Sequence, residues 1–410
     1  MEMCATSTLL QGIRVLDLSR VMSGPYCTAM LADLGAEVIK VEIPGRGDDA
    51  RHFGPYKDGE SAYFALLNRG KKSLAVDLKS PDGVKLVRDI AEKSDVVVEN
   101  FRPGVAKRLG LDYEALAGVN PQLVYASISG FGQASPLADR PALDLAIQAM
   151  SGLMSMTGPK DGGPYAVGES ITDVTTGMFC AFGIMAALFE RQRSGKGRYL
   201  EVAMLDACFS MMLTGLSRQL YLGETPSRVG NRHPESYPVD HFTTKTGDVV
   251  IAAPNDTLFN ALAKLMGQPE LAEDEKYATY DARSRNDEAL RNIIAAWMSE
   301  RTSEEVVARL GEASIPCAPV WSLGDVAGSD HARERQLVTE GRHKKLGTVP
   351  VVPQPVRFSD VEPGDPSSIP TLGEDTKAVL QDVLGLSDEA IAALVDRKIV
   401  QRTDESAKES

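Results

Sequence analysis

Short apolar runs alternate with amphipathic stretches over the first half of the chain. The runs are rich in Val, Ile and Leu and end in polar or glycine-bearing segments: residues 13–19 (IRVLDLS), 36–42 (AEVIKVE), 72–78 (KSLAVDL), 95–101 (DVVVENF) and 123–132 (LVYASISGFG). Runs of this kind are typical of buried strands. Helical stretches lie between these runs. One ends at Gly35, and another spans residues 81–93. The alternation predicts a parallel α/β sheet, which binds ligands at the carboxyl ends of its strands.

The second half of the chain is less regular. An alanine-rich amphipathic helix is predicted over about residues 175–191. Residues 226–238 are rich in Pro, Gly and polar side chains and predict a linker into a smaller domain, which contains a hairpin-like pair at 240–253 and several helices. A second Pro- and Gly-rich stretch, 346–370, precedes a last helical segment, and the tail QRTDESAKES has the composition of a disordered segment.

A length of 410 residues favours two domains rather than one compact core. Together with the two Pro- and Gly-rich stretches, it predicts a division into three parts. Residues 1–225 form the N-terminal part of a large α/β domain, 226–330 a small domain with its flanking linker, and 331–410 a linker and a C-terminal segment.

The composition argues against several classes of protein. A formal net charge of −13 disfavours nucleic-acid binding, because contact with phosphates needs a basic surface. The cysteines form no CxxC and the histidines no HExxH, which indicates reduced thiols and no metal site. The longest apolar run, 178–189, is shorter than the roughly 20 residues of a membrane span, and the N-terminus lacks the features of a signal peptide. We therefore expect a cytoplasmic protein that binds neither nucleic acid nor a membrane.

Familiar nucleotide-binding and hydrolase motifs are missing from the sequence. The opening strand, turn and helix, with Glu42 at the end of the second strand, are similar to half of a dinucleotide-binding fold. The turn reads RVMSGP rather than GxGxxG, so a structural βαβ unit is favoured over a nicotinamide dehydrogenase. Neither a GxSxG elbow nor a GxxxxGKS/T loop occurs, which argues against a serine hydrolase and a P-loop NTPase.

One aspartate stands directly before the most apolar helix, in residues 167–178, VGESITDVTTGM. Thr172 or Asp173 is a candidate N-cap of that helix, an interaction worth about 1 kcal/mol. A carboxylate at a helix N-terminus is also kept ionised by the exposed amides and the macrodipole. If Asp173 faces a cleft, it is therefore a candidate nucleophile. The neighbouring residues do not distinguish the two interpretations.

Several segments, in order, resemble the class III CoA-transferase family. They are LDLSRVMSGPYCTAMLADLGAEVIKVEIPGRGDDAR, NRGKKSLAVDLKSPDG, VVVENFRPGVAKRLGLDYEAL and SITDVTTGMFCAFGIMAAL, and the similarity runs from about Leu10 to Val400. The family includes formyl-CoA:oxalate, carnitine and dicarboxylate CoA-transferases and the α-methylacyl-CoA racemases. The resemblance implies a large doubly wound (Rossmann-like) α/β domain, a smaller α+β domain and an interlocked homodimer. It also implies that the C-terminal segment returns to complete the N-terminal sheet.

The resemblance also implies roles for particular residues. The family's catalytic aspartate stands in xxDxxxGM at the start of an apolar helix, a pattern that Asp173, Gly177 and Met178 match. The implied role is nucleophilic attack on an acyl-CoA thioester, through a mixed anhydride and an aspartyl-CoA thioester. A carboxylate suits this role because both intermediates preserve the activation of the acyl group. The residues implied to bind CoA are Val21, Met22, Ser23, Val76, Lys79, Asn100, Phe101, Arg102, Arg108, Leu143 and Asp144.

Leu143 distinguishes the transferase branch from the racemase branch. The racemases carry a histidine directly before the aspartate that Asp144 matches, because inversion at an α-carbon requires a proton to be removed and returned. A leucine transfers no proton, so the resemblance favours a transferase over an α-methylacyl-CoA racemase. A non-catalytic acyl-CoA-binding homologue is the other alternative, and the presence of Asp173 speaks against it.

The resemblance implies two substrates, an acyl-CoA donor such as succinyl-CoA and a carboxylic acid acceptor, and we expect no permanently bound cofactor. The oxalate-specific branch has a glycine-rich loop in the small domain, whereas residues 249–265 contain no glycine run. The order of the segments and PQPVRFS (353–359) resemble transferases of dicarboxylic acids such as glutarate or mesaconate. The remote carboxylate of such an acid needs a cation, for which the candidates are Arg20, Arg51, Arg102 and Arg232.

Overall fold

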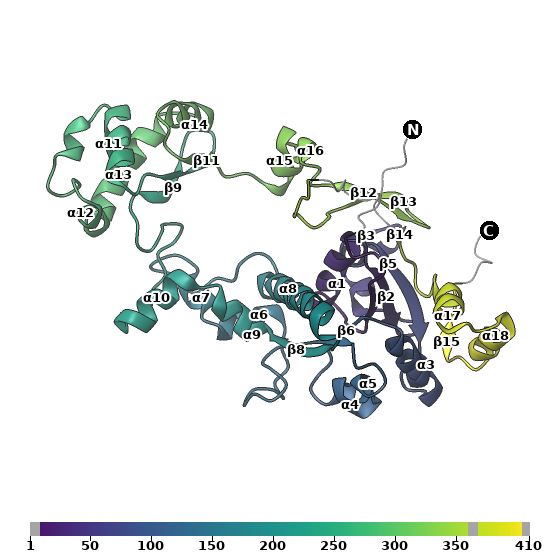
Figure 1. Ribbon diagram of the computed structural model, residues 1–410. Coiled ribbons are helices and arrows are strands. Elements are labelled where there is room, and N and C mark those ends of the chain that lie inside the picture. Colours follow the sequence, from purple (N-terminus) through teal and green to yellow (C-terminus); the bar gives the residue numbers. More distant parts are fainter. Residues whose placement is uncertain (1–8, 360–367, 404–410) are drawn as a thin grey trace. The chain divides into compact units, whose positions relative to one another are not determined.

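The computed structural model describes residues 9–359 and 368–403 and divides into two compact units (Figure 1). The first unit comprises Met1–Gly152, Val167–Leu213 and Ala332–Ser410, and the second comprises Leu153–Ala166 and Thr214–His331. The chain therefore leaves the first unit and returns to it between residues 152 and 167, directly before the segment that contains Asp173.

A seven-stranded sheet forms the centre of the first unit, in the order β15-β5-β2-β1-β6-β7-β8 (Figure 1). All neighbouring strands are parallel except the edge strand β15, which runs antiparallel to β5. The parallel strands follow the order of doubly wound sheets, in which the direction of strand addition reverses between β1 and β6. The expected α/β class with a large parallel sheet is thus confirmed. The strands are β1 (Arg14–Asp17), β2 (Glu37–Glu42), β5 (Lys71–Val76), β6 (Val96–Glu99), β7 (Val124–Ser129), β8 (Arg198–Ala203) and β15 (Val400–Gln401).

Successive side chains of a strand point to opposite faces of the sheet, and in β1, β2, β5, β6 and β7 the side chains on both faces are almost all buried, whereas the edge strand β8 is largely exposed. On one face, Val15 and Val38 pack with Cys27 of α1 and with Cys180 and Ile184 of α8. On the other face, strand residues that include Leu16 and Ile39 pack with α3, α17 and α18. The helices of this unit are α1 (Ser23–Asp33), α2 (Ala62–Leu67), α3 (Pro81–Glu92), α4 (Val105–Leu109), α5 (Tyr113–Ala117), α6 (Asp144–Met150), α8 (Ile171–Ser194), α9 (Met204–Ser210), α17 (Thr376–Leu384) and α18 (Asp388–Asp396), with a short 3₁₀ turn η1 (Asp49–His52).

Two small sheets complete the first unit. One is the hairpin of β3 (Tyr56–Lys57) and β4 (Glu60–Ser61), and the other has the order β13-β12-β14. Its strands are β12 (Thr339–His343), β13 (Gly347–Val351) and β14 (Ser368–Ile369). The helices α10 (Leu213–Leu222) and α16 (Asp330–Glu334) lie at the chain boundaries between the two units.

The second unit combines a small antiparallel sheet with helices. Its strands are β9 (Val239–Thr243), β10 (Asp248–Ala252) and β11 (Cys317–Pro319), in the order β11-β10-β9. The predicted hairpin over residues 240–253 is confirmed by the antiparallel pairing of β9 with β10. The helical elements are α7 (Leu153–Met156), α11 (Asp256–Leu265), η2 (Pro269–Ala272), α12 (Tyr280–Arg285), α13 (Asp287–Ser299), α14 (Ser303–Glu312) and α15 (Leu323–Gly328).

The C-terminal tail differs from its prediction at the start. Gln401 lies in β15 and pairs with Ala75, and the hydroxyl of Thr403 donates to the carbonyl of Leu372. Disorder from residue 401 onward is therefore wrong for these two residues, because the open edge of the sheet pairs with Gln401 and a side-chain hydrogen bond holds Thr403. Residues 404–410, the rest of the predicted tail, lie outside the described part of the chain.

Candidate active site

Asp173 lies in the first turn of α8, two residues inside its start at Ile171. The prediction that Thr172 or Asp173 is the N-cap is wrong, because Ser170 occupies that position and makes no side-chain cap bond. Asp144, from α6, takes over the capping role: its Oδ1 accepts hydrogen bonds from Thr172 N at 2.8 Å and Thr172 Oγ1 at 2.7 Å. Asp144 is distant in sequence, and its carboxylate satisfies a helix-N-terminal amide that has no partner within the helix. The Asp173 side chain is therefore left for other contacts.

The Asp173 carboxylate meets the N-terminus of α1. The Ser23 hydroxyl and backbone N–H face it and lower its pKa as donors to the carboxylate. Gly177, one helical turn after Asp173, makes this approach possible, since a Cβ built there would lie 2.7 Å from Ser23 O and 3.4 Å from Cys27 N. A glycine at this position therefore lets α8 pack against the first turn of α1, which brings the side chains of Asp173 and Ser23 together.

Burial dominates the protonation of Asp173. It raises the pKa of the carboxyl to about 6, the negative charge of Asp144 acts in the same direction, and the hydrogen bonds from Ser23 oppose both. The sequence predicts that the amides and the macrodipole of the helix N-terminus keep this group ionised, whereas burial, the largest effect on its pKa, acts in the opposite direction. At pH values well above 6 the group is nevertheless a carboxylate, in a partly buried setting that makes it a stronger nucleophile than in water.

The β1–α1 turn, residues 18–22, contains the next group of predicted site residues. Met22 is the N-cap residue of α1 and is buried, and Val21 before it has a φ of 69°. Asn100, directly after β6, holds this turn: its Oδ1 accepts from Arg20 N at 2.8 Å and its Nδ2 donates to Arg20 O at 2.7 Å. Because β1 and β6 flank the point where the strand order reverses, these residues lie where doubly wound sheets bind ligands.

The remaining predicted CoA-binding residues differ in exposure. Phe101 is partly buried, whereas Arg102 and Arg108 are exposed, all in the segment that follows β6. Leu143 precedes α6 and is 72% exposed, beside Asp144. Lys79 is also exposed, after β5.

Val76 is a correction to the predicted set. Its side chain is 1% exposed and packs in the core of the sheet, so it offers no apolar surface to a ligand. The cause is packing on the face of the sheet, where α3 and α17 cover this side chain, while Val400 of β15 pairs with Val76 along the strand edge. The backbone of residue 76 is all that this position could offer to CoA.

Two further groups near the site carry no sequence motif. Tyr63 of α2 has its pKa raised to about 12 by burial and by nearby carboxylates, Asp173 first among them. Glu99, the last residue of β6, is buried, which raises its pKa to about 7 while a hydrogen bond from Ser127 opposes the shift. The only signal for Glu99 is a charged residue at the end of the apolar run VVVE, and Tyr63 stands in an ordinary helical pattern.

The four candidate arginines for a remote carboxylate have different partners. Arg51 is bound twice by Glu42, at 2.7 and 2.8 Å, and Arg232 pairs with Asp287. Arg20 lies 3.6 Å from Asp49 and remains nearly half exposed. For Arg102, no ion pair is found within residues 9–359 and 368–403. Arg20, within the β1–α1 turn, and Arg102, in the segment after β6, are thus better placed to receive a substrate carboxylate.

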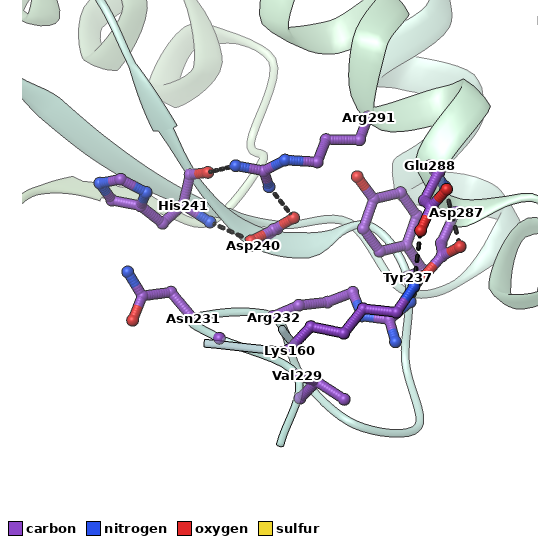
Figure 2. Close-up of a pocket in the computed structure, with 11 residues that line it drawn as sticks. Lys160, Val229, Asn231, Arg232, Tyr237, Asp240, His241, Asp287, Glu288 and Arg291 are labelled. Carbon is purple, nitrogen blue, oxygen red and sulfur yellow. Dashed lines mark hydrogen bonds and ion pairs between the residues drawn. The ribbon is translucent and has the colours of Figure 1, made fainter. Parts of the chain in front are cut away.

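A separate cavity of about 240 Å³ lies within the second unit (Figure 2). Its cations are already paired: Lys160 with Glu288 at 2.6 Å, Arg232 with Asp287, and Arg291 with Asp240. Charge balance within the cavity leaves it poorly suited to an anionic substrate. No cluster of His, Cys, Asp and Glu suited to a metal ion occurs in the described part of the chain. The residues around Asp173 are therefore the stronger candidate site.

Comparison with known proteins agrees with this placement. The sequence profile of CoA-transferase family III matches residues 10–376, so the chain belongs to that family and is a CoA-transferase. It is 38% identical to the succinyl-CoA:glutarate CoA-transferase of Mus musculus, over 97% of this chain and 92% of that protein. It is 39% identical to the acetyl-CoA:oxalate CoA-transferase of Acetobacter aceti, over 90% of this chain and 95% of that protein.

A solved structure shares the fold over nearly its whole length. The CAIB/BAIF family protein from Brucella suis is 36% identical and superposes with a TM-score of 0.81, over 91% of this chain and 99% of that one. The family resemblance inferred from the sequence motifs is thereby confirmed.

Proposed function

We propose that the protein transfers CoA from an acyl-CoA donor to a dicarboxylic acid, with Asp173 as the nucleophile. The observation that carries the proposal is the meeting of the Asp173 carboxylate with the Ser23 hydroxyl and N–H at the point where the strand order reverses. Relatives named succinyl-CoA:glutarate and succinyl-CoA:mesaconate CoA-transferases, 38% and 37% identical, support a dicarboxylic acceptor.

The reaction proceeds in two matched halves. An oxygen of Asp173 attacks the thioester carbonyl, the C–S bond breaks, and CoA thiolate leaves behind a mixed anhydride. The thiolate then attacks the aspartyl carbonyl, which releases the donor acid as a carboxylate and forms the aspartyl-CoA thioester. The acceptor carboxylate attacks this thioester and releases CoA thiolate again. Attack of the thiolate on the acceptor carbonyl forms the new acyl-CoA and regenerates Asp173, so that no proton or electron is gained or lost.

The groups around Asp173 suit this chemistry. The Ser23 N–H and hydroxyl are donors for the negative charge that develops on oxygen at the aspartyl carbonyl. The N-terminal amides of α1 favour the same charge. Partial burial limits the access of water, which would hydrolyse both the anhydride and the thioester. In this proposal the β1–α1 turn and residues 100–102 hold CoA, and Arg102 and Arg108 meet its phosphates.

A second acceptor, oxalate, is favoured by one specific comparison, the 39% identity to the acetyl-CoA:oxalate transferase of Acetobacter aceti. A panel of acceptors separates the two: glutarate, mesaconate and oxalate are each assayed with succinyl-CoA and with acetyl-CoA. A preference for oxalate with acetyl-CoA would replace glutarate and mesaconate as the proposed acceptors. Retention of full activity by Asp173→Ala would overturn the mechanism.

We further propose that the working form is a homodimer in the cytoplasm, with no bound nucleic acid, membrane or permanent cofactor. Met178, Phe182, Met185 and Phe189 lie on one side of α8 at helical spacing and are exposed in the single chain. Among the described residues, α8 is the one helix long and apolar enough to cross a membrane by length and composition. Its opposite side packs against α1 and the sheet and carries Asp173, which favours a second copy of this chain as the partner of the exposed side.

A further inference from the structure

Val21 adopts a backbone conformation that its side chain opposes. Its φ of 69° lies in the left-handed region, where the Cβ approaches the following carbonyl and β-branched residues are rare. The residue stands two positions before Ser23, so its conformation sets the direction in which α1 begins. A strained residue at this point needs a structure that holds it.

A buried ion pair supplies that hold. Lys40 of β2 lies 2.8 Å from Asp48 Oδ2, and the two side chains are almost completely inaccessible to solvent. The same Lys40 Nζ donates to Ser19 O at 2.8 Å, and Asp48 Oδ1 accepts from Val21 N at 3.0 Å. The pair therefore binds the β1–α1 turn at two points, the carbonyl of Ser19 and the N–H of Val21.

Asp48 is in turn fixed by its own surroundings. Its Oδ1 also accepts from Ala50 N at 2.9 Å, and its backbone N–H donates to Glu42 Oε2 at 3.0 Å. The charge of Lys40 lowers the pKa of Asp48 against the effect of burial, so the carboxylate is ionised wherever the enzyme works. An apolar pair of similar volume would fill this space at no desolvation cost, so stability alone does not account for two buried charges.

We propose that Lys40 and Asp48 are positioning residues for CoA transfer: they hold Val21 in its left-handed conformation and so set the donors of Ser23 against Asp173. The inference rests on the proposed function, because it concerns the geometry of the same nucleophile. Without the ion pair, Val21 relaxes to a negative φ and Ser23 moves, while Asp173 stays in place on α8.

The variants Lys40→Met and Asp48→Asn test this role. Asp48→Asn keeps an acceptor for Val21 N and serves if Lys40→Met does not fold. We expect kcat to fall about a hundredfold in Lys40→Met, as for other small displacements of catalytic geometry, and by a smaller factor in Asp48→Asn, which keeps the acceptor of Val21 N. Arg69→Met is the matched control: it breaks the buried Arg69–Asp33 pair, 2.5 Å long and away from the turn, and should lower stability while kcat is unchanged.

A rescue experiment distinguishes positioning from general stability. Glycine adopts a positive φ without a Cβ penalty, so Val21→Gly in the Lys40→Met background should recover about tenfold or more of the lost kcat. The readout is kcat rather than KM, since Val21 is itself a proposed CoA contact. Wild-type kcat in both Lys40→Met and Asp48→Asn, or no recovery with Val21→Gly, would overturn the inference. Failure of the wild-type protein to form any adduct at Asp173 would instead refute the proposed function.

Discussion

Asp144 and Thr172 are joined by two hydrogen bonds, one from the Thr172 backbone N and one from its hydroxyl, both to Asp144 Oδ1. This carboxylate thereby caps the helix that carries Asp173, and its second oxygen accepts from Gln148 Nε2 at 2.6 Å. The same negative charge raises the pKa of Asp173. One residue thus both caps the helix of the nucleophile and adds to the effect of burial on the pH at which it ionises.

Asp144→Asn should shift the acidic limb of the pH profile of kcat/KM to lower pH. The asparagine keeps an oxygen for Thr172 but removes the charge that, after burial, raises the pKa of Asp173 to about 6. Because the pKa of Glu99 is raised to about 7, the wild-type limb alone does not identify its residue, and the difference between the two proteins does. Asp139→Asn, at an exposed position, is the control. If the acidic limb of Asp144→Asn is unchanged, the assignment of that limb to the ionisation of Asp173 is refuted.

Asp173→Asn should be more stable than the wild type at neutral pH. An acid whose pKa is raised in the folded state contributes stability below its unfolded pKa and loses it as the pH rises through the folded value. For Asp173 this window runs from the ordinary 3.8 to about 6, so the ionised group destabilises the native state at higher pH. We expect a gain of about 2 kcal/mol in the free energy of unfolding, allowing for partial exposure. Urea unfolding should show a smaller gain at about pH 5 than at about pH 7.5.

Gly177→Ala should abolish most activity and destabilise the protein by about 1–3 kcal/mol, as overpacking does. The added methyl would lie 2.7 Å from the Ser23 carbonyl oxygen, which is backbone and cannot easily move aside. Gly183→Ala, on the same helix, is the matched control, since its methyl would meet the flexible end of Leu200 at 3.3 Å. Calorimetry and kcat on both variants check the prediction. Equal effects of the two substitutions would contradict the proposed approach of α8 to α1.

Phe182→Asp should convert the proposed dimer to monomers. The Phe182 side chain is 73% exposed in the single chain, so the substitution is not expected to disturb the fold. Sedimentation velocity measures the change, with Val119→Asp, at an exposed site after α5, as the control. A monomeric wild type, or flotation of the wild type with phosphatidylcholine vesicles, would count against the dimer.

The sequence predicted the sheet well because its strands are continuous apolar runs whose signal is local. All five strands expected in the first half are present, and the residues after β1 and β6 lie together as the parallel order requires. The cap of α8 escaped prediction because Asp144, which provides it, is distant in the chain from Thr172. The burial of Val76 was also missed, since it depends on helices that include α17, about 300 residues later in the chain.

The site was predicted unevenly for the same reason. Asp173 was named through a family pattern, whereas its raised pKa follows from burial that no local pattern reveals. Tyr63 and the Lys40–Asp48 pair have ordinary sequence surroundings, and tertiary packing alone brings them to the site. Contacts of this kind depend on strands and helices meeting in three dimensions, which periodicity does not encode.

Chemical trapping at Asp173 tests the central claim most directly. The protein is incubated with succinyl-CoA and hydroxylamine, digested and examined by mass spectrometry, with Asp173→Ala and a reaction without acyl-CoA as controls. An anhydride or aspartyl-CoA thioester reacts with hydroxylamine, so a hydroxamate is expected on Asp173 only when acyl-CoA is present. CoA transfer by the wild-type protein with no modification at Asp173, or modification of another carboxylate instead, would contradict the account.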